Sequence, residues 1–91
     1  MAVGEIVFSK AGRDKGRPFL VVSEAGAEYI FLADGELRKV EKPKKKKVKH
    51  VAFTGYIIES FKERLENGNK IGNSEVRKLI SGLTENVQVS N

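Results

Sequence analysis

The 91-residue chain has no cysteine, no tryptophan, one histidine and two prolines. Without cysteine there can be no disulfide, thiolate zinc site or thiol nucleophile, and His50 alone cannot form a multi-histidine metal site. The apolar runs reach about five residues, whereas a membrane-spanning helix needs about 20. The first residues also lack the basic and apolar regions of a signal peptide. We therefore expect a soluble, cytoplasmic, one-domain protein with a small core and no cofactor.

Positive charge is concentrated in one short segment. The chain has 17 Lys and Arg against 12 Asp and Glu, a net charge of +5. Residues 36–50 have eight Lys and Arg against two Glu, a net charge of +6, whereas residues 1–35 carry −1 and residues 51–91 carry 0. Such a segment suits a polyanion or an anionic surface. The alternative is a solvated lysine loop that only aids solubility.

The first half of the chain has the pattern of short strands separated by polar turns. We predict strands over 5–9, 19–23, 29–33, 37–40 and 48–53. The almost continuous apolar run 19–23 indicates a strand buried on both faces, and Asp34-Gly35 indicates a tight turn. Pro43 should end the fourth strand. Five antiparallel strands at this spacing favour a small barrel, because closure removes exposed edges.

The second half changes to a helical period. Apolar residues Ile57, Ile58, Phe61 and Leu65 share one helical face, followed by Val76, Leu79, Ile80 and Leu83 on a second helix. Thr54 is the expected N-cap of the first helix, Asn67-Gly68 its end, and Asn73-Ser74 the start of the second. Helices this short need tertiary packing. We expect a barrel over 1–55, a helical extension packed on it over 56–85, and a frayed tail over 86–91.

Residues 4–23 combine two hydrophobic strands with a glycine-framed basic loop, Ala11-Gly-Arg-Asp-Lys-Gly-Arg17. Gly12 and Gly16 allow backbone angles that a Cβ would forbid and can expose amide N–H groups. Arg13, Lys15 and Arg17 surround those amides with charge, and arginine suits bidentate phosphate contacts. Asp14 is expected to pin the turn through backbone hydrogen bonds. The alternative is an ordinary hairpin loop whose charges face water.

This segment resembles the KOW motif, a strand–loop–strand element of several ribosomal proteins and NusG-type transcription factors. Gly4, Gly12 and Gly16 match its glycines, and Ile6, Val7, Leu20 and Val22 match its hydrophobic positions. The basic loop is most similar to archaeal and eukaryotic large-subunit ribosomal proteins and to small bacterial KOW-domain RNA-binding proteins. The resemblance covers about residues 3–53. It implies an SH3-like β-barrel, mainly β with two C-terminal helices, that binds RNA and has no catalytic activity.

The candidate RNA-binding residues are the cations of the loop and of the lysine-rich segment. They are Lys10, Arg13, Lys15, Arg17, Arg38, Lys39, Lys42, Lys44, Lys45, Lys46, Lys47 and Lys49. The expected partner is structured RNA, ribosomal RNA or its precursor, and through it the ribosome, bound by a monomer with no small-molecule substrate and no membrane contact. Recognition should depend on phosphates and shape, because most aromatic residues fall on apolar core stripes.

Two other functions remain open. An SH3-like barrel can also act as a protein–protein interaction module of the transcription or translation machinery, in which case binding should depend on residues such as Tyr56. Duplex DNA binding would use the same cations. The Gly12–Gly16 spacing matches neither a nucleotide-binding phosphate loop nor a membrane helix motif. Glu59, Glu63 and Glu66 alternate with Lys62 and Arg64 on a helix surface, which indicates a solvated face and not a catalytic cluster.

Overall fold

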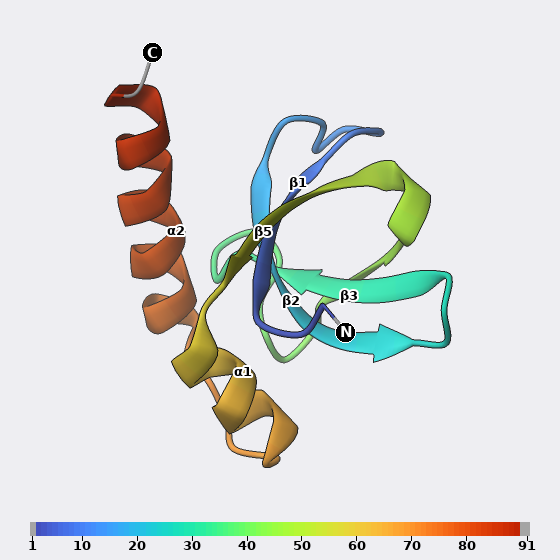
Figure 1. Ribbon diagram of the computed structural model, residues 1–91, viewed down its shortest axis with the longest axis vertical. Helices are drawn as coiled ribbons and strands as arrows, with labels where there is room; N and C mark the ends of the chain where they lie inside the picture. Colours follow the sequence, from blue (N-terminus) through green and yellow to red (C-terminus); the bar gives the residue numbers. More distant parts are fainter. Residues whose placement is uncertain (1, 90–91) are drawn as a thin grey trace.

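The fold is a curled antiparallel sheet flanked by two helices (Figure 1). The computed structural model describes the backbone of residues 2–89 and the side chains of residues 2–83. The strands are β1 (Glu5–Ser9), β2 (Pro18–Ala25), β3 (Tyr29–Ala33), β4 (Lys44–Lys47) and β5 (Val51–Ile57). A short 3-10 turn, η1 (Val48–His50), joins β4 to β5, and the helices are α1 (Glu59–Glu66) and α2 (Asn73–Val89). A mainly β fold with two C-terminal helices is therefore confirmed.

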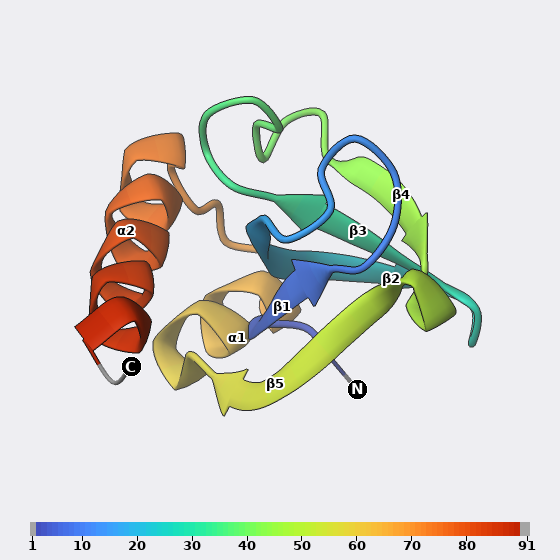
Figure 2. The ribbon, with the colours of Figure 1, turned by 90° about the horizontal axis from the view of Figure 1, so that it is seen from above.

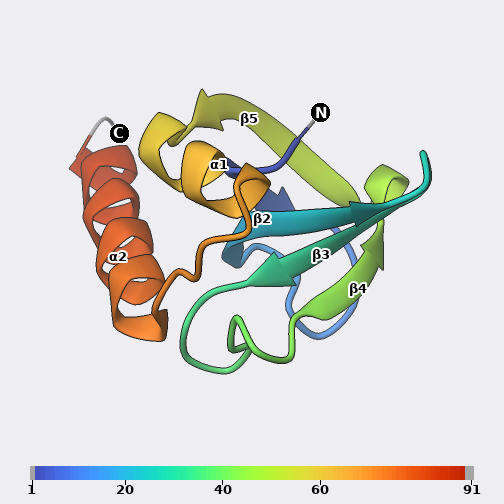
Figure 3. The ribbon, with the colours of Figure 1, turned by 90° about the horizontal axis from the view of Figure 1, so that it is seen from below.

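The strand order in the sheet is β4-β3-β2-β1-β5, and every neighbouring pair is antiparallel. Register shifts interrupt the β1–β5 and β2–β3 ladders, and such irregularities bend strands and increase their twist. Figure 3 shows the resulting curl. Within residues 2–89 no ladder joins β4 to β5, so the closed SH3-like barrel stays a prediction.

Two hydrophobic cores lie on opposite faces of β1 and β2. One lies inside the curled sheet and consists of Val7, Phe19, Val21, Ile30, Leu32 and Val51. The other lies between the sheet and the helices and consists of Ile6, Leu20, Phe61, Ile71, Val76 and Ile80. Adjacent residues in a strand point to opposite faces, so Leu20 and Val21 enter different cores. This confirms the prediction of a strand buried on both faces and of helices packed on the sheet.

The first helix begins later than the sequence pattern indicated. Its N-cap is Ile58, and Thr54 lies in β5, where its hydroxyl donates to the Ile6 carbonyl at 2.6 Å. Gly55 next to it has φ 78°, and its amide donates to Glu5 Oε2 at 2.8 Å. These bonds hold an irregular stretch of β5 against β1. The Thr54 N-cap prediction was therefore wrong, whereas the helix end at Asn67-Gly68 is confirmed.

Other element boundaries also differ from the prediction. The fifth strand, expected over 48–53, begins at Val51 after η1 and continues to Ile57. Residues 37–40 form bends and a turn in place of the expected strand, and the strand next to β3 is instead the lysine run Lys44–Lys47. The second helix continues to Val89, so residues 86–89 are helical where a frayed tail was expected, and residues 90–91 lie outside the described residues. Within residues 2–89, neither helix has both the length and the apolar character needed to cross a membrane.

Candidate nucleic-acid interface

Two loops lie side by side at one end of the sheet (Figure 2). We call residues 10–17, between β1 and β2, the basic loop, and residues 34–43, between β3 and β4, the second loop. Figures 2 and 3 both place the second loop beside the start of α2. Strand β4 follows the second loop directly, so the two basic segments of the sequence reach the same end of the molecule.

Glycine conformations and internal hydrogen bonds shape the basic loop. Gly12 has φ 85° and Gly16 has φ 87°, values that favour glycine over residues with a side chain. The Gly16 amide donates to the Ser9 carbonyl at 2.8 Å, and the amides of Lys15 and Arg17 also donate within the loop. The expected exposure of amide groups is therefore wrong for Gly16, and the Lys15 and Arg17 amides are also occupied. Side chains are therefore the only groups in this half of the loop, among the described residues, that could donate to a phosphate.

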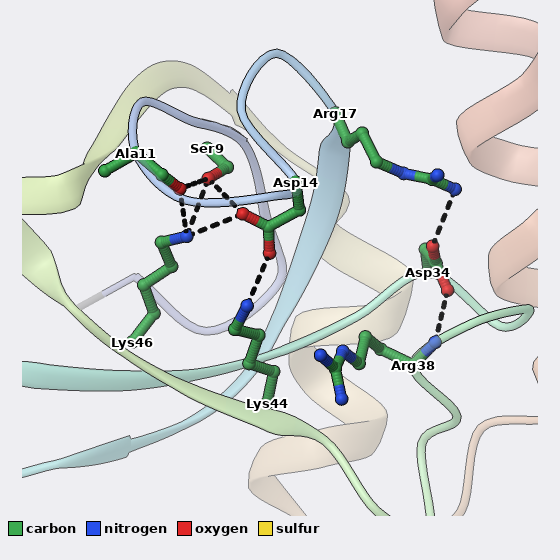
Figure 4. A network of polar contacts seen from close by, with 8 residues as sticks. All are labelled: Ser9, Ala11, Asp14, Arg17, Asp34, Arg38, Lys44 and Lys46. Carbon is green, nitrogen blue, oxygen red and sulfur yellow. Dashed lines mark hydrogen bonds and ion pairs between the residues drawn. The ribbon is translucent and has the colours of Figure 1, made fainter.

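The Asp14 carboxylate joins the basic loop to β4 (Figure 4). Its Oδ1 atom lies 2.7 Å from both the Lys46 ammonium and the Ser9 hydroxyl, and its Oδ2 atom lies 2.9 Å from the Lys44 ammonium. The Lys46 ammonium also donates to the Ser9 hydroxyl and the Ala11 carbonyl, each at 2.7 Å. Asp14 is therefore structural, as expected, but it acts through side chains of a distant strand.

Burial and hydrogen bonding act in opposite directions on the pKa of Asp14. Burial alone raises this pKa, because it disfavours the charged carboxylate. Hydrogen bonds from Lys46, Ser9 and Lys44 together outweigh burial and hold the pKa of Asp14 well below its usual range. The carboxylate stays ionised in the folded protein at neutral pH and neutralises part of the charge of the two lysines.

The four consecutive lysines of β4 divide into two pairs. Side chains alternate along a strand, so Lys44 and Lys46 reach Asp14, whereas Lys45 and Lys47 are exposed on the other face. Lys46 is almost fully buried, with 7% of its side chain exposed, and the Lys45 ammonium lies 4.5 Å from the centre of the Tyr29 ring. Lys46 is therefore not available to a phosphate, which corrects its assignment as an RNA-binding residue.

Asp34 organises the second loop. Its Oδ1 atom accepts hydrogen bonds from the amides of Glu36 and Arg38, both at 2.9 Å. Its Oδ2 atom lies 3.6 Å from the Arg17 guanidinium of the basic loop. These contacts replace the tight hairpin that Asp34-Gly35 indicated, and they explain why residues 37–40 do not return as a strand.

The N-terminal turn of α2 supports the second loop from the other side. The Val40 backbone amide donates to Asn73 Oδ1 at 2.8 Å, and the Asn73 side-chain Nδ2 donates to Glu41 Oε1 at 2.8 Å. The Arg77 guanidinium donates to the Gly35 carbonyl at 3.0 Å. Gly35 packs so closely that an added Cβ would overlap the Asn73 carbonyl oxygen. The helix is therefore part of the framework that positions this loop.

A groove of about 320 Å³ separates the two loops. Its lining consists of Arg13, Asp14, Arg17, Phe19, Asp34, Leu37, Arg38 and Lys44. Four of these residues are cations and two are carboxylates, and Leu37 is 67% exposed although it is a large hydrophobic residue. The groove thus combines a basic rim with an apolar surface.

Ten of the twelve predicted binding residues are exposed. They are Lys10, Arg13, Lys15, Arg17, Arg38, Lys39, Lys42, Lys45, Lys47 and Lys49. The three glycines that match the KOW motif have different surroundings. Gly12 and Gly16 shape the basic loop, whereas Gly4 lies against Lys62 of α1, where an added Cβ would clash. The sequence did not indicate that Asp34 and Asn73 hold the second loop or that Leu37 lines the groove. For Leu37 a signal existed, since it is an isolated apolar residue in a charged loop.

The described residues contain no group of three or more His, Asp or Glu side chains arranged to hold a metal ion. Comparison of the chain with models of protein families gives no match, and comparison with curated proteins gives none either. The resemblance to the KOW motif therefore stays a prediction carried by residues 3–53.

Proposed function

We infer that this protein is a non-catalytic, cytoplasmic RNA-binding protein that recognises structured RNA through the basic loop, the second loop and the exposed face of β4. Ribosomal RNA or its precursor is the proposed target, which would associate the protein with the ribosome. The observation that carries this proposal is that two basic segments, residues 10–17 and 34–49, lie next to each other although they are separated in the sequence (Figure 2).

The charge distribution supports a polyanionic partner. Residues 10–17 and 34–49 together hold 12 Lys and Arg against four Asp and Glu, a net charge of +8. The remaining residues hold five Lys and Arg against eight Asp and Glu, a net charge of −3. Contacts between Asp14 and the two lysines of β4 bring the basic segments together. A positive end on an otherwise acidic molecule attracts a polyanion and orients it.

The nature of the exposed residues favours structured RNA over an unpaired strand. Proteins that bind single strands without sequence preference use exposed aromatic rings as stacking platforms. The exposed aromatic residues, Phe53 and Tyr56, lie on β5 and do not line the groove. Arginine and lysine side chains around two loops instead suit the closely spaced phosphates of a folded RNA.

A titration of a fluorescein-labelled RNA hairpin, followed by fluorescence anisotropy across a salt series, tests the proposal. We expect log K to fall linearly with log salt, because each neutralised phosphate releases counterions, with a slope of about −0.7 to −0.9 per contact. Competition with a DNA duplex of the same sequence at fixed salt should displace the RNA poorly. Equal competition by the DNA would support duplex DNA binding and contradict the proposal.

A different observation favours the alternative function, a protein–protein interaction module. Phe53 is 42% exposed and Tyr56 is 53% exposed on β5. If this surface is the binding site, partner binding should persist at high salt and be lost on Tyr56→Ser. Binding to RNA that is steep in salt and unchanged by Tyr56→Ser would exclude this alternative as the main function.

A further inference from the structure

We propose that the groove between the two loops holds the base of one unpaired guanine nucleotide of a folded RNA. This inference rests on the proposed function and adds base selectivity to an interface that otherwise recognises phosphates. Its residues are Asp34, Leu37, Arg13, Arg17 and Arg38, all of which line the groove. Figure 4 shows three of them, Arg17, Asp34 and Arg38.

The size and surface of the groove suit a single base. Its volume of about 320 Å³ is at the lower end of the range for small-ligand sites, which is about 300–1,000 Å³. Leu37 supplies the exposed apolar lining, whereas Phe19 also lines the groove but is only 1% exposed. A flat aromatic base would cover this surface. A guanidinium group, such as that of Arg38, provides a planar surface on which an unpaired base stacks.

Asp34 provides the polar recognition. The residue is buried, at 7% exposure, and its Oδ1 atom already accepts two amide hydrogen bonds. The contact of its Oδ2 atom with Arg17 measures 3.6 Å, which is longer than a hydrogen bond. Asp34 lines the groove, and no donor among the described residues makes a hydrogen bond to its Oδ2 atom. It can accept up to two further hydrogen bonds.

Guanine matches this arrangement better than the other bases. Its Watson–Crick edge presents two adjacent donors, N1–H and N2–H, which a carboxylate oxygen with free lone pairs can accept. Its O6 atom lies next to them and would face the donors of Arg17. Adenine and cytosine place a ring nitrogen acceptor beside their amino group, and uracil places a carbonyl on each side of its single donor. Each of these would turn an acceptor toward Asp34.

The basic rim would hold the phosphates that flank the base. The guanidinium groups of Arg13 and Arg38 have no ion-pair partner among the residues that the structure describes. Arginine contacts phosphate bidentately. An unpaired nucleotide could therefore place its base in the groove while its backbone stays in contact with the rim.

Five RNA hairpins test this inference. Four differ only in one unpaired bulge nucleotide, G, A, C or U, and the fifth is fully paired. The G-bulge hairpin should bind roughly tenfold more tightly than the others, the usual scale for one good base contact. Asp34→Asn retains an acceptor for the two loop amides but places a donor at the Oδ2 position, so it should abolish the preference for G. Leu37→Ser should weaken binding of the G-bulge hairpin alone.

The matched control is Glu36→Gln, which removes one negative charge from the same loop without lining the groove, and it should keep the preference for G. Simple electrostatics predicts that Asp34→Asn tightens binding to every hairpin, because it removes a negative charge. Uniform tightening, or equal and salt-dependent affinity of the wild type for all five hairpins, would overturn the guanine site and leave the proposed function intact. A lack of salt-dependent binding to any hairpin would overturn the proposed function itself. Thermal unfolding of each variant establishes that it is folded.

Discussion

At the scale of single residues, Asp14 determines how the basic loop and β4 are joined in the proposed interface. One carboxylate holds two lysines of β4 and the Ser9 hydroxyl, which connects a loop to a strand 30 residues further along the chain. A buried ammonium such as that of Lys46 is tolerable only when it is paired and hydrogen-bonded. The lysine run therefore has a structural half and an exposed half, although its four residues are chemically identical.

Lys46→Ala and Lys45→Ala should have very different effects on stability. Removing Lys46 leaves the mostly buried Asp14 carboxylate with one fewer cation, and breaking a buried pair costs about 3 kcal/mol. Removing Lys45 loses an exposed cation–π contact worth about 0.5–1 kcal/mol. Urea denaturation of both variants measures the difference. Similar free energies of unfolding for the two variants would contradict the structural role of Lys46.

The lowered pKa of Asp14 predicts a pH dependence of stability. Its folded-state pKa lies below the unfolded value of about 3.9, so its stabilisation is present above that value and is lost as the pH falls toward the folded pKa. The difference in unfolding free energy between wild type and Asp14→Asn should be constant above about pH 5 and should shrink below about pH 4. Denaturant titrations from neutral to acidic pH measure this difference. A difference that stays constant or grows in acid would contradict the ionised Asp14 network.

At the scale of elements, α2 and the second loop form one unit. Asn73 accepts from the Val40 amide and donates to Glu41, while Arg77 donates to the Gly35 carbonyl. The hydrogen bond to Asn73 also contributes to a lowered pKa of Glu41, an exposed residue. A helix outside the KOW-like segment thus restrains the loop that carries Arg38, Lys39 and Lys42. Restraining a binding loop reduces the entropy lost when a partner binds.

Asn73→Ala should release the second loop and weaken RNA binding several-fold. The number of phosphate contacts does not change, so the slope of log K against log salt should stay at the wild-type value. Hydrogen exchange of the amides of residues 36–42 should become faster. Ser74→Ala, at the next and exposed position, is the control and should change neither quantity. A reduced salt slope for Asn73→Ala would show that Asn73 affects the contacts themselves.

The elements that were predictable are those with a clear local pattern. Apolar runs specified β1, β2 and β3, and the helical stripe from Val76 to Leu83 specified α2. Strand β4 was not predictable, because lysine has a low strand propensity and its stabilising partner, Asp14, is distant in the sequence. Leu37–Val40 had a strand-like pattern, but hydrogen bonds that the Arg38 and Val40 amides donate to Asp34 and Asn73 hold it in another conformation. Tertiary contacts overrode local preference in both cases.

At the scale of the whole molecule, charge separation is the main feature. The basic segments could be located from the sequence, because charge counts need no structure. That these segments meet at one end of the sheet could not be predicted, because it depends on side-chain contacts between residues 30 or more positions apart. The same holds for the groove between the loops. Replacing all four lysines of β4 would remove Lys44 and Lys46, which hold the basic loop through Asp14, together with the exposed charges of Lys45 and Lys47. Exposed loop residues therefore give a cleaner test of binding.

The most direct test is the salt dependence of RNA-hairpin binding in two double variants with the same charge change. Arg13→Gln with Lys15→Gln removes two exposed cations from the basic loop, and Lys70→Gln with Lys78→Gln removes two exposed cations elsewhere. The first pair should lower the magnitude of the salt slope by roughly 1.4 to 1.8, about 0.7 to 0.9 for each lost phosphate contact, whereas the second pair should leave it unchanged. Equal changes in both, or binding that does not depend on salt, would contradict an RNA interface at the basic loop.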